Sequence, residues 1–226
     1  MSPKLKKAVV LLSGGLDSAT TLYYARSQGY RCHALIIDYG QRHRKEVRAA
    51  RSIARRSGYP ATLLRVRLGW GGSALTDRKI RVPRGRSLRE MGRGIPSTYV
   101  PARNTIFLSC AVSLAEAIGA SAIAIGANAV DFSGYPDCRP AYYDAFRRVI
   151  RRGTQAGVEG RPMRIITPLI RKSKAQIIRL GRRLGVPFEL TWSCYLGGRR
   201  PCGRCDSCAL RAKGFKEARM PDPALR

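Results

Sequence analysis

Residues 11–18 read Leu-Leu-Ser-Gly-Gly-Leu-Asp-Ser and come directly after the apolar run Ala8-Val9-Val10. The pattern predicts a short buried strand, a tight turn and a helix behind it. Glycines let backbone N–H groups close around an anion, and a helix N-terminus adds partial positive charge. The hydroxyls of Ser13 and Ser18 add donors, whereas Asp17 would repel a phosphate unless Mg²⁺ lay between them. The stretch therefore predicts a phosphate-binding loop that works with magnesium.

The spacing of this loop separates it from two other phosphate-binding motifs. It lacks the Gly-Lys-Ser/Thr of a Walker loop, and it is not the Gly-x-Gly-x-x-Gly of dinucleotide-binding folds. It resembles the pyrophosphate loop of enzymes that split ATP between the α and β phosphates. The alternative is an ordinary strand-to-helix turn, but two serines and an aspartate in register favour the pyrophosphate loop.

Strand-like runs alternate with helical patterns along the chain. Strands are expected near residues 8–12, 33–38, 62–66, 122–126 and 164–167. Helices are expected near residues 16–28, 43–57, 104–118, 140–152 and 174–184. This alternation predicts an α/β fold, a Rossmann-like parallel sheet with helices on both faces. Because ligands bind at the carboxyl ends of parallel strands, the loops after the first, second and fourth strands should converge on one site.

The length of 226 residues fits one domain with a small appendage. We expect an ATP-binding domain over residues 1–193 and a tail over 194–226 that packs on it. Residues 69–100 are rich in glycine, proline and arginine and break the strand–helix alternation. A long irregular stretch inside a compact domain is usually functional or disordered, so we expect a flexible lid over the site.

The net charge of +29 comes mostly from arginines spread over the whole chain. Such a surface attracts RNA, but aromatic residues are not interleaved with the basic ones, so a general arginine bias on solvated faces is favoured. No apolar run approaches the roughly 20 residues of a membrane span. The start of the chain only faintly resembles a signal peptide, because its apolar stretch is short and runs into the loop. We therefore expect a cytoplasmic protein with no membrane partner.

Four of the seven cysteines crowd the C-terminal end with the spacing C-x7-C-x2-C-x2-C. They are Cys194, Cys202, Cys205 and Cys208. In a reducing cytosol, metal ligation is favoured over disulfides. Four thiolates around Zn²⁺ form a closed structural site. An iron–sulfur cluster is the alternative, but the ferredoxin run has a further cysteine and a proline after it, where this chain has Ala209-Leu210. The tail is thus predicted to be a zinc knuckle with one structural zinc.

Five stretches together resemble the 7-cyano-7-deazaguanine synthase family. They are residues 12–18, residues 38–43 (Asp-Tyr-Gly-Gln-Arg-His), residues 100–105 (Val-Pro-Ala-Arg-Asn-Thr), residues 133–140 (Ser-Gly-Tyr-Pro-Asp-Cys-Arg-Pro) and residues 191–195 with the cysteines beyond them. The resemblance runs from about residue 8 to about residue 218. One departure is Ala102, where many relatives are expected to have glycine, and the arginine content is another.

The resemblance implies an adenine nucleotide alpha hydrolase-like fold and an ATP-dependent C–N ligase. Such an enzyme converts 7-carboxy-7-deazaguanine and ammonia to 7-cyano-7-deazaguanine (preQ0), for queuosine or archaeosine biosynthesis. AMP transferred to the carboxylate makes a good leaving group, ammonia gives the amide, and a second activation gives the nitrile. The sequence leaves two other functions open: a thiolase-like tRNA-modifying enzyme, and a zinc-knuckle nucleic-acid-binding protein with a vestigial loop. A homodimer is compatible with the sequence.

The resemblance also assigns roles to residues. The ATP-binding stretch would run from the loop through the first helical turns: Leu12, Ser13, Gly14, Gly15, Leu16, Asp17, Ser18, Ala19, Thr20, Thr21 and Leu22. Asp17, Ser18, Lys174 and Arg103 are the candidate catalytic residues. Lys174 would add a cation for phosphate charge, although lysines at helix starts are often only solvent-facing.

The substrate-binding candidates are Arg103, Asp131 and Asp137. The planar fork of Arg103 suits a carboxylate or a phosphate, although it could also serve only structure. Either aspartate could read the N–H edge of a guanine-like base, but aspartates also stabilise turns. The sequence does not choose between them. His43 could move protons near neutral pH or simply begin a helix.

Overall fold

The computed structural model describes residues 6–128 and 134–225. Its strands and longer helices, in chain order, are β1 (Lys7–Leu11), α1 (Leu16–Ser27), β2 (Arg31–Asp38), α2 (Lys45–Ser57), β3 (Ala61–Arg65), α4 (Arg103–Ala117), β4 (Ala122–Ala124), α6 (Pro140–Gly153), β5 (Arg164–Ile166), α8 (Lys174–Arg183) and α9 (Asp206–Ala218). The short helices are α3 (Leu88–Met91), η1 (Pro136–Cys138), α7 (Gln155–Val158), η2 (Phe188–Leu190) and η3 (Pro223–Leu225).

The described strands form one parallel sheet in the order β3-β2-β1-β4-β5. The chain moves outward from β1 through β2 to β3 and then returns to the other side of β1 for β4. The direction of winding therefore reverses between β1 and β4, and loops that leave these two strands diverge to open a crevice. This order confirms the predicted parallel α/β fold.

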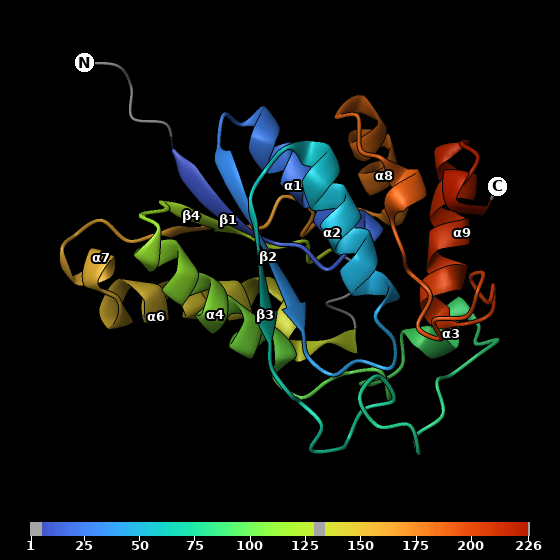
Figure 1. The fold of residues 1–226 in the computed structure, drawn as a ribbon. Coiled ribbons are helices and arrows are strands. Elements are labelled where there is room, and N and C mark those ends of the chain that lie inside the picture. The colour runs from blue at the N-terminus through green and yellow to red at the C-terminus, as the bar shows by residue number, and fades with distance from the viewer. Residues whose placement is uncertain (1–5, 129–133, 226) are drawn as a thin grey trace.

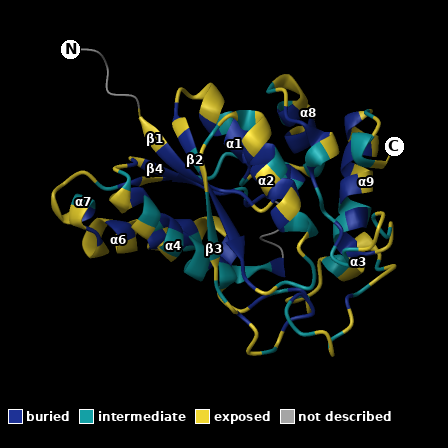
Figure 2. Ribbon diagram, viewed as in Figure 1, coloured by how far each residue is buried: buried dark blue, intermediate teal, exposed yellow. Residues whose placement is uncertain are grey.

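Helices cover both faces of the sheet (Figure 1). Alternate residues of β1 point to opposite faces, so Ala8 and Val10 pack against α1, α2 and α8, whereas Val9 and Leu11 pack against α4 and α6. The central strands are buried and the outer faces of α2 and α6 are exposed (Figure 2). Burial on both faces explains why these strands read as continuous apolar runs.

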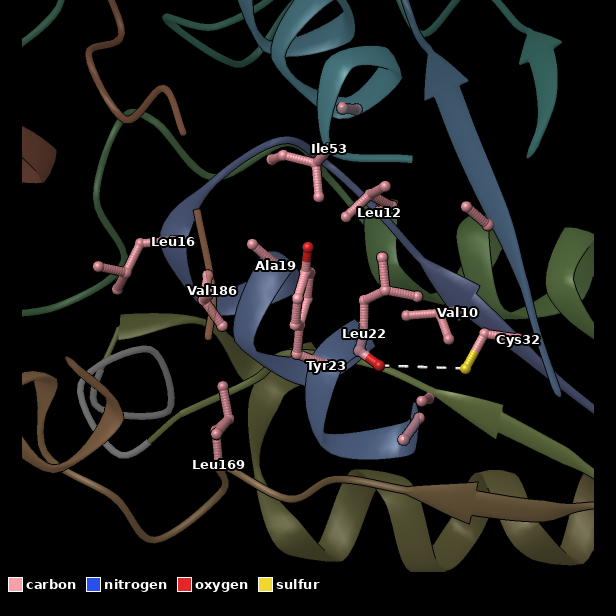
Figure 3. Close-up of a cluster of buried hydrophobic side chains, with 14 of the residues drawn as sticks. Val10, Leu12, Leu16, Ala19, Leu22, Tyr23, Cys32, Ile53, Leu169 and Val186 are labelled. Atoms are coloured by element: carbon pink, nitrogen blue, oxygen red, sulfur yellow. Dashed lines mark hydrogen bonds between the residues drawn. The ribbon is translucent and has the colours of Figure 1, made fainter. Parts of the chain in front are cut away.

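The core beside α1 fixes the loop that precedes this helix. Leu12, Leu16 and Leu22 are almost fully buried there, together with Val186 of the segment after α8 (Figure 3). The Cys32 thiol, in the same cluster, donates to the Leu22 carbonyl over 4.0 Å. Apolar residues on both sides of the turn thus hold the backbone of residues 13–15 at the sheet edge.

The described elements depart from the sequence expectation mainly in the tail. The strands and long helices up to α8 lie within a few residues of the predicted ranges, but α9 was not expected. Its buried face includes Arg211 and Gly214 as well as Phe215, so it lacks the apolar periodicity that marks an amphipathic helix. Among the described helices, none has both the length and the apolar character that a bilayer crossing requires.

Candidate active site

A cavity opens at the carboxyl edge of the sheet, beside β1. Its walls include Leu11 of β1, Ile37 of β2, and Ile125 and Gly126 after β4. Tyr39, in the loop after β2, also lines it. The loops after the first, second and fourth strands therefore converge as the strand pattern predicted. Residues 129–133 of the third loop lie outside the described part of the chain.

The predicted phosphate-binding loop forms one side of this cavity. Ser13 Oγ and Ser18 Oγ lie 3.0 Å apart, and the backbone N–H of Ser13 donates to Ser18 Oγ over 3.2 Å. Gly14 has a φ of 87° and packs on α2 so closely that a Cβ there would lie 2.2 Å from the Glu46 carbonyl oxygen. Gly15 precedes α1 without a side-chain cap. The first-turn N–H groups of α1 thus lack a capping side chain, which suits an anion.

The ATP-binding stretch divides at Ser18. Leu12, Ser13, Gly15, Leu16, Asp17 and Ser18 line the cavity. Ala19 and Leu22 are fully buried in the core instead. The hydroxyls of Thr20 and Thr21 donate to backbone oxygens one turn back, at 2.8 and 2.9 Å. The structure therefore places residues 19–22 behind the wall rather than on it.

Asp17 is the most strongly anchored acidic group of the cavity. Its Oδ2 forms an ion pair with Lys174, the first residue of α8, and accepts a hydrogen bond from Asn128 over 3.2 Å. Lys174 is thus brought against the loop from 157 residues away. Asp17 Oδ1 is buried and has no hydrogen-bond partner within residues 6–128 and 134–225. One oxygen is fixed by the protein, which leaves the other as an acceptor for a ligand.

Arg103 lies on the opposite wall, at the first position of α4. Its guanidinium carbon lies 5.9 Å from the ring centre of Tyr39 and 5.8 Å from that of Phe107. Ala102 before it has a φ of 50°, in the left-handed region that favours glycine, so the backbone is strained there. The rings hold the guanidinium in place at the cavity wall, where it can meet an anion.

Of the two aspartates proposed to read the base, only Asp137 lies in the described part of the chain. Asp137 is buried, and its Oδ2 accepts a hydrogen bond over 3.0 Å from the backbone N–H of Asn104. It therefore holds the N-terminus of α4 beside Asn104 and Cys138, which line the cavity, and a role of Asp137 in reading the base stays a prediction. Asp131 lies outside the described residues.

Sequence reasoning did not single out two charged residues that line the cavity, Glu46 and Arg211. Glu46 lies in the first turn of α2, and burial raises its pKa to about 7. Arg211 of α9 is buried and forms an ion pair with Asp222, and it also donates to Thr191 Oγ1 and Ser193 Oγ. No sequence motif marks either residue, because each lies at the cavity only through packing between segments that are far apart in the sequence. His43, which was considered as a proton carrier, instead contacts the Cys194 carbonyl oxygen through Nε2 at 2.9 Å.

The four tail cysteines gather into one cluster. The sulfur atoms of Cys194, Cys202, Cys205 and Cys208 all lie within 4.8 Å of one another. Hydrogen bonds from the thiols of Cys205 and Cys208 lower the pKa of Cys194. The backbone N–H groups of Leu196 and Cys202 also point at its sulfur, at 3.5 and 3.4 Å. A compact set of four sulfur ligands stabilised in this way fits the predicted zinc knuckle.

Residues 69–100 contact this cluster. Arg84 forms a β-bridge with Cys205, the Gly85 N–H donates to the Arg204 carbonyl over 2.8 Å, and Arg86 forms an ion pair with Asp206. Val82 packs among the cysteines. The segment is therefore joined to the tail at the side of the cavity that Ser207 and Arg211 line.

The comparisons with known proteins agree with this geometry. The family model described as "Queuosine biosynthesis protein QueC" matches residues 7–219. The 7-cyano-7-deazaguanine synthase of Thermosynechococcus vestitus is 57% identical over 221 residues, which cover 96% of this chain and 94% of that protein. The protein of the same name from Anaeromyxobacter dehalogenans is 58% identical over 221 residues, with the same coverage.

A solved structure is similar in fold at much lower identity. The NMN synthetase from Francisella tularensis superposes with a TM-score of 0.51 at 15% identity, over 88% of this chain and 71% of that one. This similarity supports the Rossmann-like architecture alone. The family match and the two relatives, by contrast, extend over nearly the whole chain, the phosphate loop and the cysteine cluster included. The chain belongs to the family of queuosine biosynthesis protein QueC.

Proposed function

We propose that this chain converts 7-carboxy-7-deazaguanine and ammonia to 7-cyano-7-deazaguanine at the expense of ATP. Relatives of that name share 57–58% of its residues over 96% of its length. The observation that carries the proposal is the ion pair between Asp17 and Lys174 beside an uncapped helix N-terminus, at the edge of a cavity. This arrangement suits a polyphosphate, because it offers backbone donors, a cation and a free carboxylate oxygen together.

The proposed reaction has two activations. In the first, a carboxylate oxygen of the substrate attacks the α-phosphorus of ATP, and pyrophosphate leaves. Ammonia then attacks the acyl carbon, AMP leaves with the electron pair of the C–O bond, and an amide forms. In the second, the amide oxygen is adenylated, and loss of AMP together with the N–H protons leaves the C≡N bond. The chain contributes by orienting groups and holding charge.

The loop side of the cavity is proposed to hold the phosphates and their metal. Ser13, Gly15 and Ser18 would face the pyrophosphate, and Lys174 would offset part of its charge. The buried Asp17 Oδ1, which lacks a partner among the described residues, fits a ligand of Mg²⁺. Bound Mg²⁺ would neutralise charge on the leaving pyrophosphate.

The opposite side is proposed to hold the deazaguanine. Arg103 would pair with the substrate carboxylate, and Asp131 or Asp137 would read the base edge. Zinc at the cysteine cluster would be structural, because four protein sulfurs complete its usual coordination. We place the split between the ATP-binding domain and the tail at residues 193 and 194, and residues 69–100 as a lid that the tail supports. A cytoplasmic location would keep the cysteines reduced.

The test is a reaction of the purified chain with ATP, MgCl₂, ammonium chloride and 7-carboxy-7-deazaguanine, followed by mass spectrometry. We expect the nitrile, with one AMP released at each activation. Asp17→Ala should lower the rate by at least about 10²–10³-fold, because it removes a group that holds charge in the transition state, and it should leave zinc bound. Asp144→Ala is the matched control, since Asp144 pairs with Arg147 on the exposed side of α6.

Two results would contradict the proposal. AMP release that requires tRNA would indicate an RNA-modifying enzyme. Absence of AMP release under every condition would indicate a binding protein. Loss of zinc in Asp17→Ala would show that the cavity and the cysteine cluster are not separate sites.

A further inference from the structure

Glu46 is a second carboxylate at the phosphate-loop end of the cavity. It lies in the first turn of α2, and its backbone oxygen packs against Gly14. The neighbouring residue Lys45 donates to the Gly198 carbonyl of the tail, so the first turn of α2 is held from both sides. The side chain lines the cavity together with Asp17 and Arg103. Glu46 is therefore fixed close to where the proposed adenylate would form.

The surroundings of Glu46 differ from those of Asp17. Asp17 has Lys174 and Asn128 as partners. Glu46, by contrast, makes no side-chain hydrogen bond or ion pair with any described residue. Burial raises its pKa to about 7, although the charge of Arg103 acts in the opposite direction. A partly buried carboxylate without a direct partner favours a proton or a small cation.

The reaction itself brings such a cation. Ammonia in neutral water is mostly ammonium, which has no lone pair to attack a carbon, so a base must remove a proton beside the acyl adenylate. The other occupants of the cavity, a nucleotide and an aromatic carboxylate, are anions that an unpaired carboxylate would repel. Ammonium, in contrast, is both attracted to Glu46 and activated by it.

We propose that the Glu46 carboxylate binds the ammonium ion and accepts its proton. This inference rests on the proposed function. One N–H bond of ammonium breaks and its proton moves to a Glu46 oxygen. The nitrogen lone pair forms the C–N bond, the C–O bond to the phosphate breaks, and AMP leaves with that electron pair. The second proton that the nitrogen loses passes to solvent, as does the proton on Glu46 before the next turnover.

The test compares two nucleophiles in the full-length protein. Ammonium needs a base, whereas hydroxylamine is largely unprotonated at neutral pH and attacks an acyl adenylate without one. We expect Glu46→Gln to lower kcat/KM for ammonium by about 10²–10³-fold, the range of general-base effects. Hydroxamate formation from hydroxylamine should stay within about threefold of the unmodified protein. Glu189→Gln, which alters an exposed glutamate outside the cavity, should change neither rate.

Other outcomes overturn the inference. Equal loss with both nucleophiles, together with a raised KM for 7-carboxy-7-deazaguanine, would mean that Glu46 reads the base or shapes the pocket. Unchanged rates with both would mean that it has no part in the reaction. Failure of the proposed function is distinguishable, because the unmodified protein would then give neither hydroxamate nor amide.

Discussion

Two walls of the cavity, the phosphate-loop wall and the tail wall, are built in different ways. The loop wall, residues 12–18, comes from one continuous stretch between β1 and α1. The tail wall collects Trp192, Ser193, Tyr195, Ser207 and Arg211, which lie on both sides of the cysteine cluster. The first wall is fixed by local sequence and the central sheet. The second depends on the cysteine cluster and on contacts between segments far apart in the sequence, so we expect it to be the less stable of the two.

The walls meet at a small set of contacts. The backbone N–H of Trp192 donates to the Gly14 carbonyl over 2.9 Å, and the His43 ring contacts the Cys194 carbonyl oxygen. A Cβ at Gly197 would lie 2.3 Å from the His43 ring, so the tail approaches the start of α2 closely. Loss of the tail wall should therefore open the cavity without unfolding the sheet.

Removal of the metal proposed at the cysteine cluster should produce the largest difference between the loop wall and the tail wall. A chelator, or Cys205→Ser, takes away the bonds that hold α9, and structural zinc contributes about 10 kcal/mol or more in small domains. We expect synthesis to stop and the Tm to fall by about 20 °C or more. Hydrogen exchange should accelerate in α9 and residues 82–86 before it does in β1 and α1.

Cys110→Ala is the control, because Cys110 is a partly buried cysteine of α4 outside the cluster. It should keep both zinc and activity. An active, metal-free protein of unchanged Tm would show that the tail wall stands without the metal.

The difference between the walls also explains what the sequence could predict. The loop could be predicted because all of its candidate ligating groups lie within seven residues after a buried strand, where short-range geometry determines their placement. The cysteine cluster was found because spacing alone identifies a metal knuckle. Lys174 was only a candidate, since nothing local shows that the start of α8 lies against Asp17.

Other residues of the site could not be predicted. Arg211 and Glu46 have no motif, and each lines the cavity through contacts among segments far apart in the sequence. The contact between Asp137 and the Asn104 N–H could not be predicted for a related reason, since the two residues are 33 positions apart in the sequence. Residues that face a ligand and residues that cap a helix share the same chemistry, so only the fold separates them.

Breaking the ion pair between Arg211 and Asp222 should perturb the tail wall less than metal removal does. Both side chains are more than nine-tenths buried, and Asp222 accepts hydrogen bonds at 2.6 and 2.8 Å. Asp222→Asn leaves the buried guanidinium without its counter-charge, which costs about 3–4 kcal/mol. We expect a lower midpoint of urea unfolding and a raised KM for substrates, because Arg211 lines the cavity.

An exposed pair on the same helix gives the comparison for that variant. Lys213 and Glu217 lie 3.5 Å apart and are nearly half exposed. Glu217→Gln should change the free energy of unfolding by less than about 0.5 kcal/mol. Equal changes in the free energy of unfolding for Asp222→Asn and Glu217→Gln would show that the buried Arg211–Asp222 pair does not stabilise the tail wall.

Glu46 lies where the two walls meet, and its substitution should change stability in the opposite direction. Its pKa is about 7 in the folded protein, above its ordinary value of 4.5, so folding favours the protonated form. This contribution is fully present below pH 4.5 and is lost as the pH rises through 7. Above pH 7 the folded protein must hold a charge that the unfolded chain holds more easily.

Glu46→Gln, which stays neutral, should therefore be more stable than the unmodified protein by about 3 kcal/mol at pH 8.5 and by less than about 1 kcal/mol at pH 5. Urea unfolding at the two pH values measures the difference, with Glu189→Gln, at an exposed glutamate outside the cavity, as the control. If Glu46→Gln differed from the unmodified protein by the same free energy of unfolding at both pH values, Glu46 would be solvated and have an ordinary pKa. A variant that is more stable yet unable to use ammonium would show that the chain keeps an unfavourable charge at the junction of the walls because the reaction needs it.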